Sequence, residues 1–100
     1  MVVLFAEVKL KPEALDQAVA NCTAMLEPSR AENGCFSYTF YTETGAEPTI
    51  TFFEEWESRE ILNAHFETEH FINFQKVMAD CFASAPKITI YEVTSVDRIS

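Results

Sequence analysis

Hydrophobic and polar residues alternate in four segments of the chain, and each segment is predicted to form a β-strand. In residues 2–10 one face is wholly apolar, while the opposite face begins apolar and ends charged. Residues 35–42 and 49–57 are rich in aromatic and β-branched side chains, which favour strands. Residues 87–96 supply a fourth strand. A turn of the hairpin kind is expected at residues 43–48, where Gly45 and Pro48 interrupt the alternation.

The alternation also predicts which side chains share a face, because successive side chains of a strand point to opposite sides. Glu54 is the one acidic residue expected among the apolar side chains of its face. In the second strand one face is predicted to carry Phe36, Tyr38 and Phe40. In the third strand one face is predicted to carry Ile50, Phe52, Glu54 and Trp56.

Apolar residues recur at helical spacing in residues 11–32, 59–66 and 69–83, which predicts three helices. Pro12 suits a first helical turn, and Gly34 suits a left-handed stop after the first helix. Ser58 and Thr68 are predicted N-caps of the two later helices. The predicted buried stripes are Leu15, Ala18, Val19, Cys22, Met25, Leu26 and Ser29 in the first helix, and Phe71, Phe74, Val77, Met78, Cys81 and Phe82 in the last.

The resulting order, β-α-β-β-α-α-β, is that of the ferredoxin-like α+β fold, with a four-stranded antiparallel sheet and helices on one face. At 100 residues we expect a single domain spanning residues 1–100. Such a sheet leaves its second face bare, and here several strands carry aromatic residues on both faces. We therefore predict a homodimer in which this sheet face packs on a second copy of the chain.

Composition narrows the classes of function. Lysine plus arginine number 7 and aspartate plus glutamate 16, so the net charge is 7 − 16 = −9. This balance argues against binding nucleic acid or an anionic membrane. Nine phenylalanines exceed what one small core needs, which favours a ligand pocket or an interface. We expect neither a signal peptide nor a transmembrane helix. Three widely spaced cysteines argue against disulfides and favour a cytoplasmic protein.

Residues 50–71 carry the only tryptophan and both histidines of the chain. If the helices fold back over the third strand, Glu54, Trp56, His65 and His70 would line one pocket, for chemistry or for packing. A carboxylate on an apolar strand face needs a partner, so Glu54 either orients a histidine or pairs with a basic residue across the dimer. The spacing of the two histidines is not that of a helical zinc site, and we predict no metal.

Three segments carry a family resemblance: residues 29–38 (SRAENGCFSY), 52–56 (FFEEW) and 64–71 (AHFETEHF). Together and in this order, they resemble the antibiotic biosynthesis monooxygenase family, and the resemblance extends over residues 2–96. It implies a small ferredoxin-like protein that forms a dimeric α+β barrel. Asn33 departs from the proline that many members carry in this turn, but Asn-Gly also makes the turn.

The reactions of this family differ among its members. Some oxidise quinols or polyketide phenols with O2 and no cofactor, others degrade haem, and another isomerises a phosphorylated signalling molecule. The haem-degrading members carry an Asn-Trp-His pattern, with asparagine late in the first strand and tryptophan in the short helix. Here those positions hold Glu7 or Val8 and His65. We therefore expect no haem and no cofactor.

The resemblance implies an oxidoreductase that acts on a small aromatic substrate and O2, and it assigns a role to each candidate residue. His65, at the position that matches the family, would be the base, and Glu54 would orient it. Substrate contacts would come from Trp56, His70, Tyr38 and Phe52. Each of these residues also has a purely structural interpretation. Two other functions stay open: an isomerase that uses the same base without oxygen, and a non-catalytic dimeric binding module.

Overall fold

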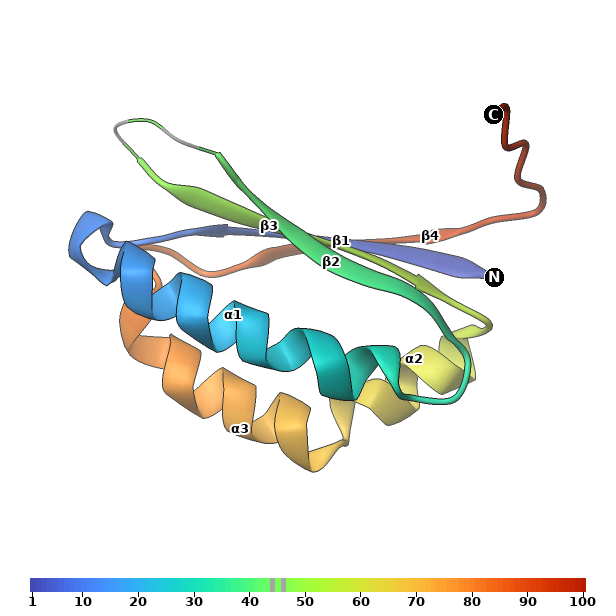
Figure 1. Cartoon of the computed structure of the whole chain (residues 1–100), viewed down its shortest axis with the longest axis horizontal. Helices are drawn as coiled ribbons and strands as arrows, with labels where there is room; N and C mark the ends of the chain where they lie inside the picture. Colours follow the sequence, from blue (N-terminus) through green and yellow to red (C-terminus); the bar gives the residue numbers. More distant parts are fainter. Residues whose placement is uncertain (44, 46) are drawn as a thin grey trace.

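The four predicted strands form one antiparallel sheet in the computed structural model, which describes residues 1–43, 45 and 47–100. The strand order is β2-β3-β1-β4. The strands β1 (Val2–Lys9) and β3 (Thr49–Trp56) are central, and β2 (Cys35–Glu43) and β4 (Lys87–Glu92) are the edges (Figure 1). Every neighbouring pair is antiparallel. The predicted ferredoxin-like α+β fold is therefore confirmed.

All three α-helices cover one face of the sheet (Figure 1). They are α1 (Leu15–Arg30), α2 (Arg59–Phe66) and α3 (Glu69–Met78), and short 3₁₀ turns at Pro12–Ala14 and Ala79–Cys81 precede α1 and follow α3. The core lies between these two layers, and the stripe predicted for the first helix is buried or half-buried throughout, as expected.

Side-chain caps fix where the two later helices begin. The Ser58 Oγ accepts a hydrogen bond from the Ile61 amide at 3.2 Å, and the Thr68 Oγ1 accepts one from the Phe71 amide at 3.3 Å. Both caps were predicted. Only Glu67 and Thr68 separate α2 from α3. This short connection holds the end of α2 beside the start of α3.

Gly34 ends the turn after α1 with a φ of +85°, the left-handed conformation that was predicted. A Cβ atom at this position would lie 2.8 Å from Cγ2 of Ile61, so only glycine fits between the turn and α2. The Gly34 carbonyl also accepts a hydrogen bond from the Glu57 amide at 2.8 Å. The turn therefore lies tightly against the β3–α2 connection and brings Glu32 toward the histidines.

The face predicted for Phe36 is wrong, because β2 begins with a β-bulge. Cys35 pairs with Trp56 and Ser37 pairs with Glu55, so two steps along β2 match one step along β3. Phe36 is the extra residue and is 56% exposed. The bulge leaves Cys35, rather than Phe36, beside Trp56.

Several predicted ends also differ from the structure. The helix predicted to residue 83 ends at Met78, and Val77 is 45% exposed because it faces away from the sheet. The strand predicted to residue 96 ends at Glu92, which pairs with Val2, the first residue of β1. Beyond it the Val93 amide still donates to the Met1 carbonyl at 2.9 Å, and the ladder of described pairs goes no further. Of the turn predicted at residues 43–48, residues 44 and 46 lie outside the described part of the chain.

Candidate active site

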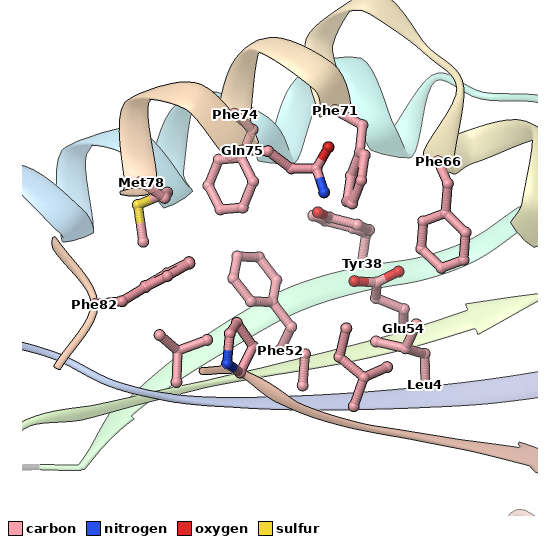
Figure 2. Close-up of a pocket in the computed structure, with 14 residues that line it drawn as sticks. Leu4, Tyr38, Phe52, Glu54, Phe66, Phe71, Phe74, Gln75, Met78 and Phe82 are labelled. Carbon is pink, nitrogen blue, oxygen red and sulfur yellow. The ribbon is translucent and has the colours of Figure 1, made fainter. Parts of the chain in front are cut away.

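A cavity of about 450 Å³ lies between the inner face of the sheet and α3 (Figure 2). Its volume is in the range of ordinary small-molecule sites. Inner-face residues of all four strands contribute, and phenylalanines of α2 and α3 contribute from the helical side. Most lining side chains are aliphatic or aromatic. The polar ones are Tyr38, Glu54 and Gln75.

Glu54 is the carboxylate of this cavity, although only 5% of its surface is exposed. The Trp56 indole Nε1–H donates to its Oε1 at 2.9 Å. Burial raises the pKa of Glu54 from 4.5 to about 7, the hydrogen bond from Trp56 opposes this rise, and the Glu32 charge adds to it. Glu54 therefore changes protonation near neutral pH, which suits a group that accepts and returns a proton.

Tyr38 lies beside Glu54 across the β2–β3 pair and also lines the cavity. Burial first, and then the Glu54 charge, raise the pKa of the Tyr38 phenol. The phenol therefore keeps its proton and can donate a hydrogen bond. Phe52 follows on the same strand face, and its ring meets the Phe74 ring edge-on with centroids 5.8 Å apart. Of the residues proposed from the sequence, Glu54, Tyr38 and Phe52 line the cavity.

Trp56 lies behind the cavity wall, because its side chain is fully buried and is not part of the lining. Its ring meets Tyr38 edge-on at 6.3 Å and lies 4.6 Å from the His65 ring, centroid to centroid. The expectation that Trp56 and the histidines line one pocket with Glu54 is not what the structure shows. Trp56 instead holds Glu54 from behind.

The two histidines share one acceptor, which is Glu32. Its Oε2 lies 2.6 Å from Nδ1 of His65 and 2.7 Å from Nε2 of His70. Glu32 comes from the turn after α1, His65 from the last turn of α2 and His70 from the first turn of α3. The partner of the histidine is therefore Glu32, whereas the sequence had suggested Glu54.

His65 is fully buried, outside the lining of the cavity. Its ring contacts three residues of the cavity wall: Tyr38, Phe66 and Phe71, with centroid separations of 5.5, 5.9 and 5.1 Å. Burial lowers the pKa of His65 more than the hydrogen bond to Glu32 raises it, which favours the neutral ring. With Nδ1–H donating to Glu32, Nε2 carries the lone pair and has no hydrogen-bond partner among the described residues.

A family model described as antibiotic biosynthesis monooxygenase matches residues 1–77. The chain belongs to this family. It is 34% identical to a Bacillus subtilis protein named "Putative monooxygenase YcnE" over 74 residues, which are 74% of this chain and 78% of that protein. It is 33% identical to "Uncharacterized protein sll1783" of Synechocystis over 98% of this chain and 67% of that protein.

Solved structures agree with this membership. The Mycobacterium tuberculosis protein Rv0793 superposes with a TM-score of 0.84 at 28% identity, over 99% of this chain and 98% of that one. A Nitrosomonas europaea protein named "Putative antibiotic biosynthesis monooxygenase" superposes with a TM-score of 0.89 at 21% identity, over 95% of this chain and 100% of that one, which supports the fold alone. The family resemblance drawn from the three sequence segments is confirmed.

Glu32, His65 and His70 place three potential metal-ligand atoms within 4.8 Å of one another. Both oxygen–nitrogen separations are those of short hydrogen bonds and fall below the roughly 3.3 Å expected between two ligands of a tetrahedral zinc ion. A ligating histidine also needs an acceptor for its second ring nitrogen, which Nε2 of His65 lacks within the described chain. The geometry fits a hydrogen-bonded network better than a metal site.

Glu32 is the residue that sequence reasoning missed. The signal was present, because Glu32 lies in the first of the three family-like segments and both histidines lie in the third. Nothing in the periodicity connects them, since 33 and 38 residues separate Glu32 from its partners. An acidic residue near a helix end is usually solvated, so the sequence alone gives no reason to expect a partner for Glu32. Its hydrogen bonds to the histidines follow from the way the turn packs against α2.

The cysteines of this family member are not candidates for nucleophilic chemistry. All three are free thiols, with Cys22 and Cys81 buried and Cys35 half-buried. Burial raises the pKa of Cys22 to about 12 and that of Cys35 to about 11, so neither forms a thiolate at neutral pH.

Within the described residues, the helices are also too short or too polar to cross a membrane.

Proposed function

We propose that the protein is a cofactor-independent monooxygenase that oxidises a quinol or another hydroxy-aromatic compound with O2, with Glu54 as the base. The observation that carries the proposal is a buried carboxyl group with a pKa of about 7 that lines an apolar cavity. Membership of the antibiotic biosynthesis monooxygenase family supports the reaction class.

The chemistry asks for a base, a dry cavity and a donor that stabilises an anion. Ionised Glu54 takes the proton of the substrate hydroxyl, and the electron-rich anion then transfers electrons to O2. One oxygen atom enters the ring and the other leaves as water, while oxidation of the quinol to a hydroxyquinone supplies the electrons. In this proposal the Tyr38 phenol donates to the substrate oxygen, and Phe52 and Phe74, which line the same cavity, flank the ring.

His65 remains the second candidate for the base. Its buried Nε2 has no hydrogen-bond partner among the described residues, and the hydrogen bond to Glu32 favours the tautomer with the lone pair on Nε2. The ring lies behind Tyr38, Phe66 and Phe71, however, and direct contact with substrate would require these side chains to move. We therefore assign proton transfer to Glu54 and propose that His65 supports Trp56 through the tilted ring pair.

The test is O2 uptake by purified protein with a panel of reduced quinones and dihydroxynaphthalenes. Glu54→Gln keeps the side-chain volume and an acceptor for Trp56 but removes the base. Glu55→Gln is the matched control, since Glu55 is also buried but points to the other face of the sheet, where Ser37 and Arg98 contact it. We expect uptake above autoxidation in the wild type and in Glu55→Gln, and at least a hundredfold loss in Glu54→Gln.

Each outcome has a clear meaning. Equal uptake in Glu54→Gln and wild type would remove Glu54 as the base, and a parallel His65→Gln variant would then test the second candidate. If no substrate stimulates uptake, Glu54-dependent proton exchange measured without oxygen would indicate the isomerase. Ligand binding without either activity would indicate the binding module.

We also propose that the open face of the sheet forms a homodimer. Phe5 contacts Phe53 at 5.3 Å and Tyr91 at 6.2 Å between ring centroids, and this cluster lies on the face opposite the helices. Phe5 is 37% exposed and Tyr91 54% exposed. A continuous aromatic patch of this kind is usual at an interface and rare on a free surface.

A further inference from the structure

The cavity is polar at one end and apolar at the other. Glu54 and Tyr38 share one row across the sheet with Leu4. The floor then continues along β1 through Ala6 to Val8. Four residues of an extended strand span roughly 13 Å, so the cavity is longer than one six-membered ring. Figure 2 shows the same arrangement, with Glu54 and Phe66 toward one side and Met78 and Phe82 toward the other.

The apolar half leads to the opening. Three lining residues are exposed: Gln75 on α3, Pro86 before β4 and Ile88 on β4. Ile88 pairs with Ala6 and is 56% exposed even though it belongs to the inner face. β4 is an edge strand, and the cavity therefore opens between this edge and α3. A ligand whose hydroxyl reaches Glu54 passes the remainder of its length along side chains that are apolar apart from Gln75.

The charges of the lining restrict the ligand further. None of the residues that line the cavity is basic, and Glu54 is the only carboxylate among them. Proton transfer from a neutral hydroxyl to Glu54 moves one negative charge and adds none. An anionic ligand would place a second negative charge in the same apolar space without a counter-ion, which is costly.

We propose that the substrate is a neutral hydroxy-aromatic compound that carries an alkyl chain on the side remote from the reacting hydroxyl. This inference rests on the proposed function, because it takes Glu54 as the place where the hydroxyl reacts. It adds that the row from Ala6 to Ile88 recognises the alkyl chain, and that ligands ionised at the Glu54 end are rejected.

Binding measured by calorimetry at pH 8 tests the proposal without turnover. The probes are phenol, 4-hexylphenol and 4-hexylbenzoate, none of which needs O2 to bind. Burial of one methylene favours binding about fourfold, so even a partly covered chain predicts that 4-hexylphenol binds at least tenfold more tightly than phenol. We expect 4-hexylbenzoate to bind at least tenfold more weakly than 4-hexylphenol, because its carboxylate meets Glu54.

Two variants distinguish binding in this cavity from non-specific hydrophobic binding elsewhere on the protein. Ala6→Leu fills the floor between the polar and apolar ends, and Ile88→Glu places a charge at the exposed opening. Each is expected to remove most of the gain from the hexyl chain, measured as the ratio of 4-hexylphenol to phenol affinity in the same variant. Ile88→Glu keeps the test open if Ala6→Leu does not fold, since position 88 is exposed.

A hexyl gain that is unchanged in a folded variant would overturn the proposal, as would equal binding of the benzoate and the phenol. The two proposals can fail separately. Glu54-dependent O2 uptake without any preference for extended neutral ligands would leave the monooxygenase and refute the substrate class. The binding pattern above without O2 uptake would support the ligand class and refute the monooxygenase.

Discussion

The indole Nε1–H of Trp56 donates to the Glu54 carboxylate at 2.9 Å, although the two side chains differ in surroundings. Glu54 lines the cavity, whereas Trp56 is fully buried behind it. The hydrogen bond favours the ionised carboxylate, while burial favours the protonated acid. The balance between these two effects places the pKa of Glu54 at about 7. Trp56 thereby tunes the proposed base without touching the substrate.

Trp56→Phe should raise the pKa of Glu54 above about 7, because it removes the donor to the ionised form and leaves the burial. A hydrogen bond to a charged group contributes about 1.5–3 kcal/mol, which corresponds to a rise of roughly one to two pH units. Carboxyl ¹³C NMR titration measures this directly. Glu55→Gln is the control, and its Glu54 resonance should titrate as in the wild type. An unchanged midpoint in Trp56→Phe would contradict the role given to the indole.

Glu54→Gln should change how stability depends on pH. The folded pKa of Glu54 is raised, so its ionisation opposes folding: the native state loses stability as pH rises from 4.5 through about 7. Glutamine does not ionise, so the variant does not lose native-state stability over this pH range. Relative to wild type, the variant should gain up to about 3 kcal/mol between pH 4 and pH 8. Urea unfolding at both values provides the measurement, and a difference that does not vary with pH would refute the shift.

Glu32→Ala should destabilise the protein by about 2–3 kcal/mol, because the buried Nδ1–H of His65 loses its acceptor. Glu27→Ala is a suitable control, since Glu27 is exposed on α1 and should change stability by no more than about 0.5 kcal/mol. Urea unfolding of both variants near pH 7 compares them. Similar losses in the two variants would mean that the Glu32–histidine network contributes nothing specific.

Gly34→Ala should cost more than about 1 kcal/mol, because its φ of +85° disfavours a side chain and the new methyl would lie 2.8 Å from Ile61. Gly45→Ala is the matched control, since a Cβ there meets nothing within 4 Å. Adding Ile61→Val to Gly34→Ala should recover part of the steric cost. Thermal unfolding can rank the variants, and equal melting temperatures for the two glycine variants would contradict this reading.

Phe5→Glu should convert the proposed homodimer into a monomer, because it places a charge in the aromatic cluster on the open sheet face. Ile72→Glu is the control: Ile72 is 44% exposed on α3, so a charge there should leave the assembly unchanged. Sedimentation equilibrium at micromolar concentration distinguishes the two states. A monomeric wild type would refute the dimer before any variant is made.

Local signals in the sequence predicted most of the fold because they act over a few residues. Ser58 and Thr68 mark the helix starts through their own hydrogen bonds, and Gly34 marks a turn through its left-handed backbone. Alternation placed Glu54 on the inner face of its strand. The misplaced Phe36 shows the limit of this reasoning, since a bulge depends on how two strands register and not on either strand alone.

The sequence by itself therefore determined the order of the elements, the inner faces of the central strands and the family. Only the tertiary structure decided that Glu32 bonds both histidines, that Trp56 backs Glu54, and that His65 lies behind the cavity wall. Periodicity predicts which way a side chain points but not which residues contact it in the folded protein. The pKa of Glu54 depends on these contacts, because burial, the indole donor and the Glu32 charge set it together.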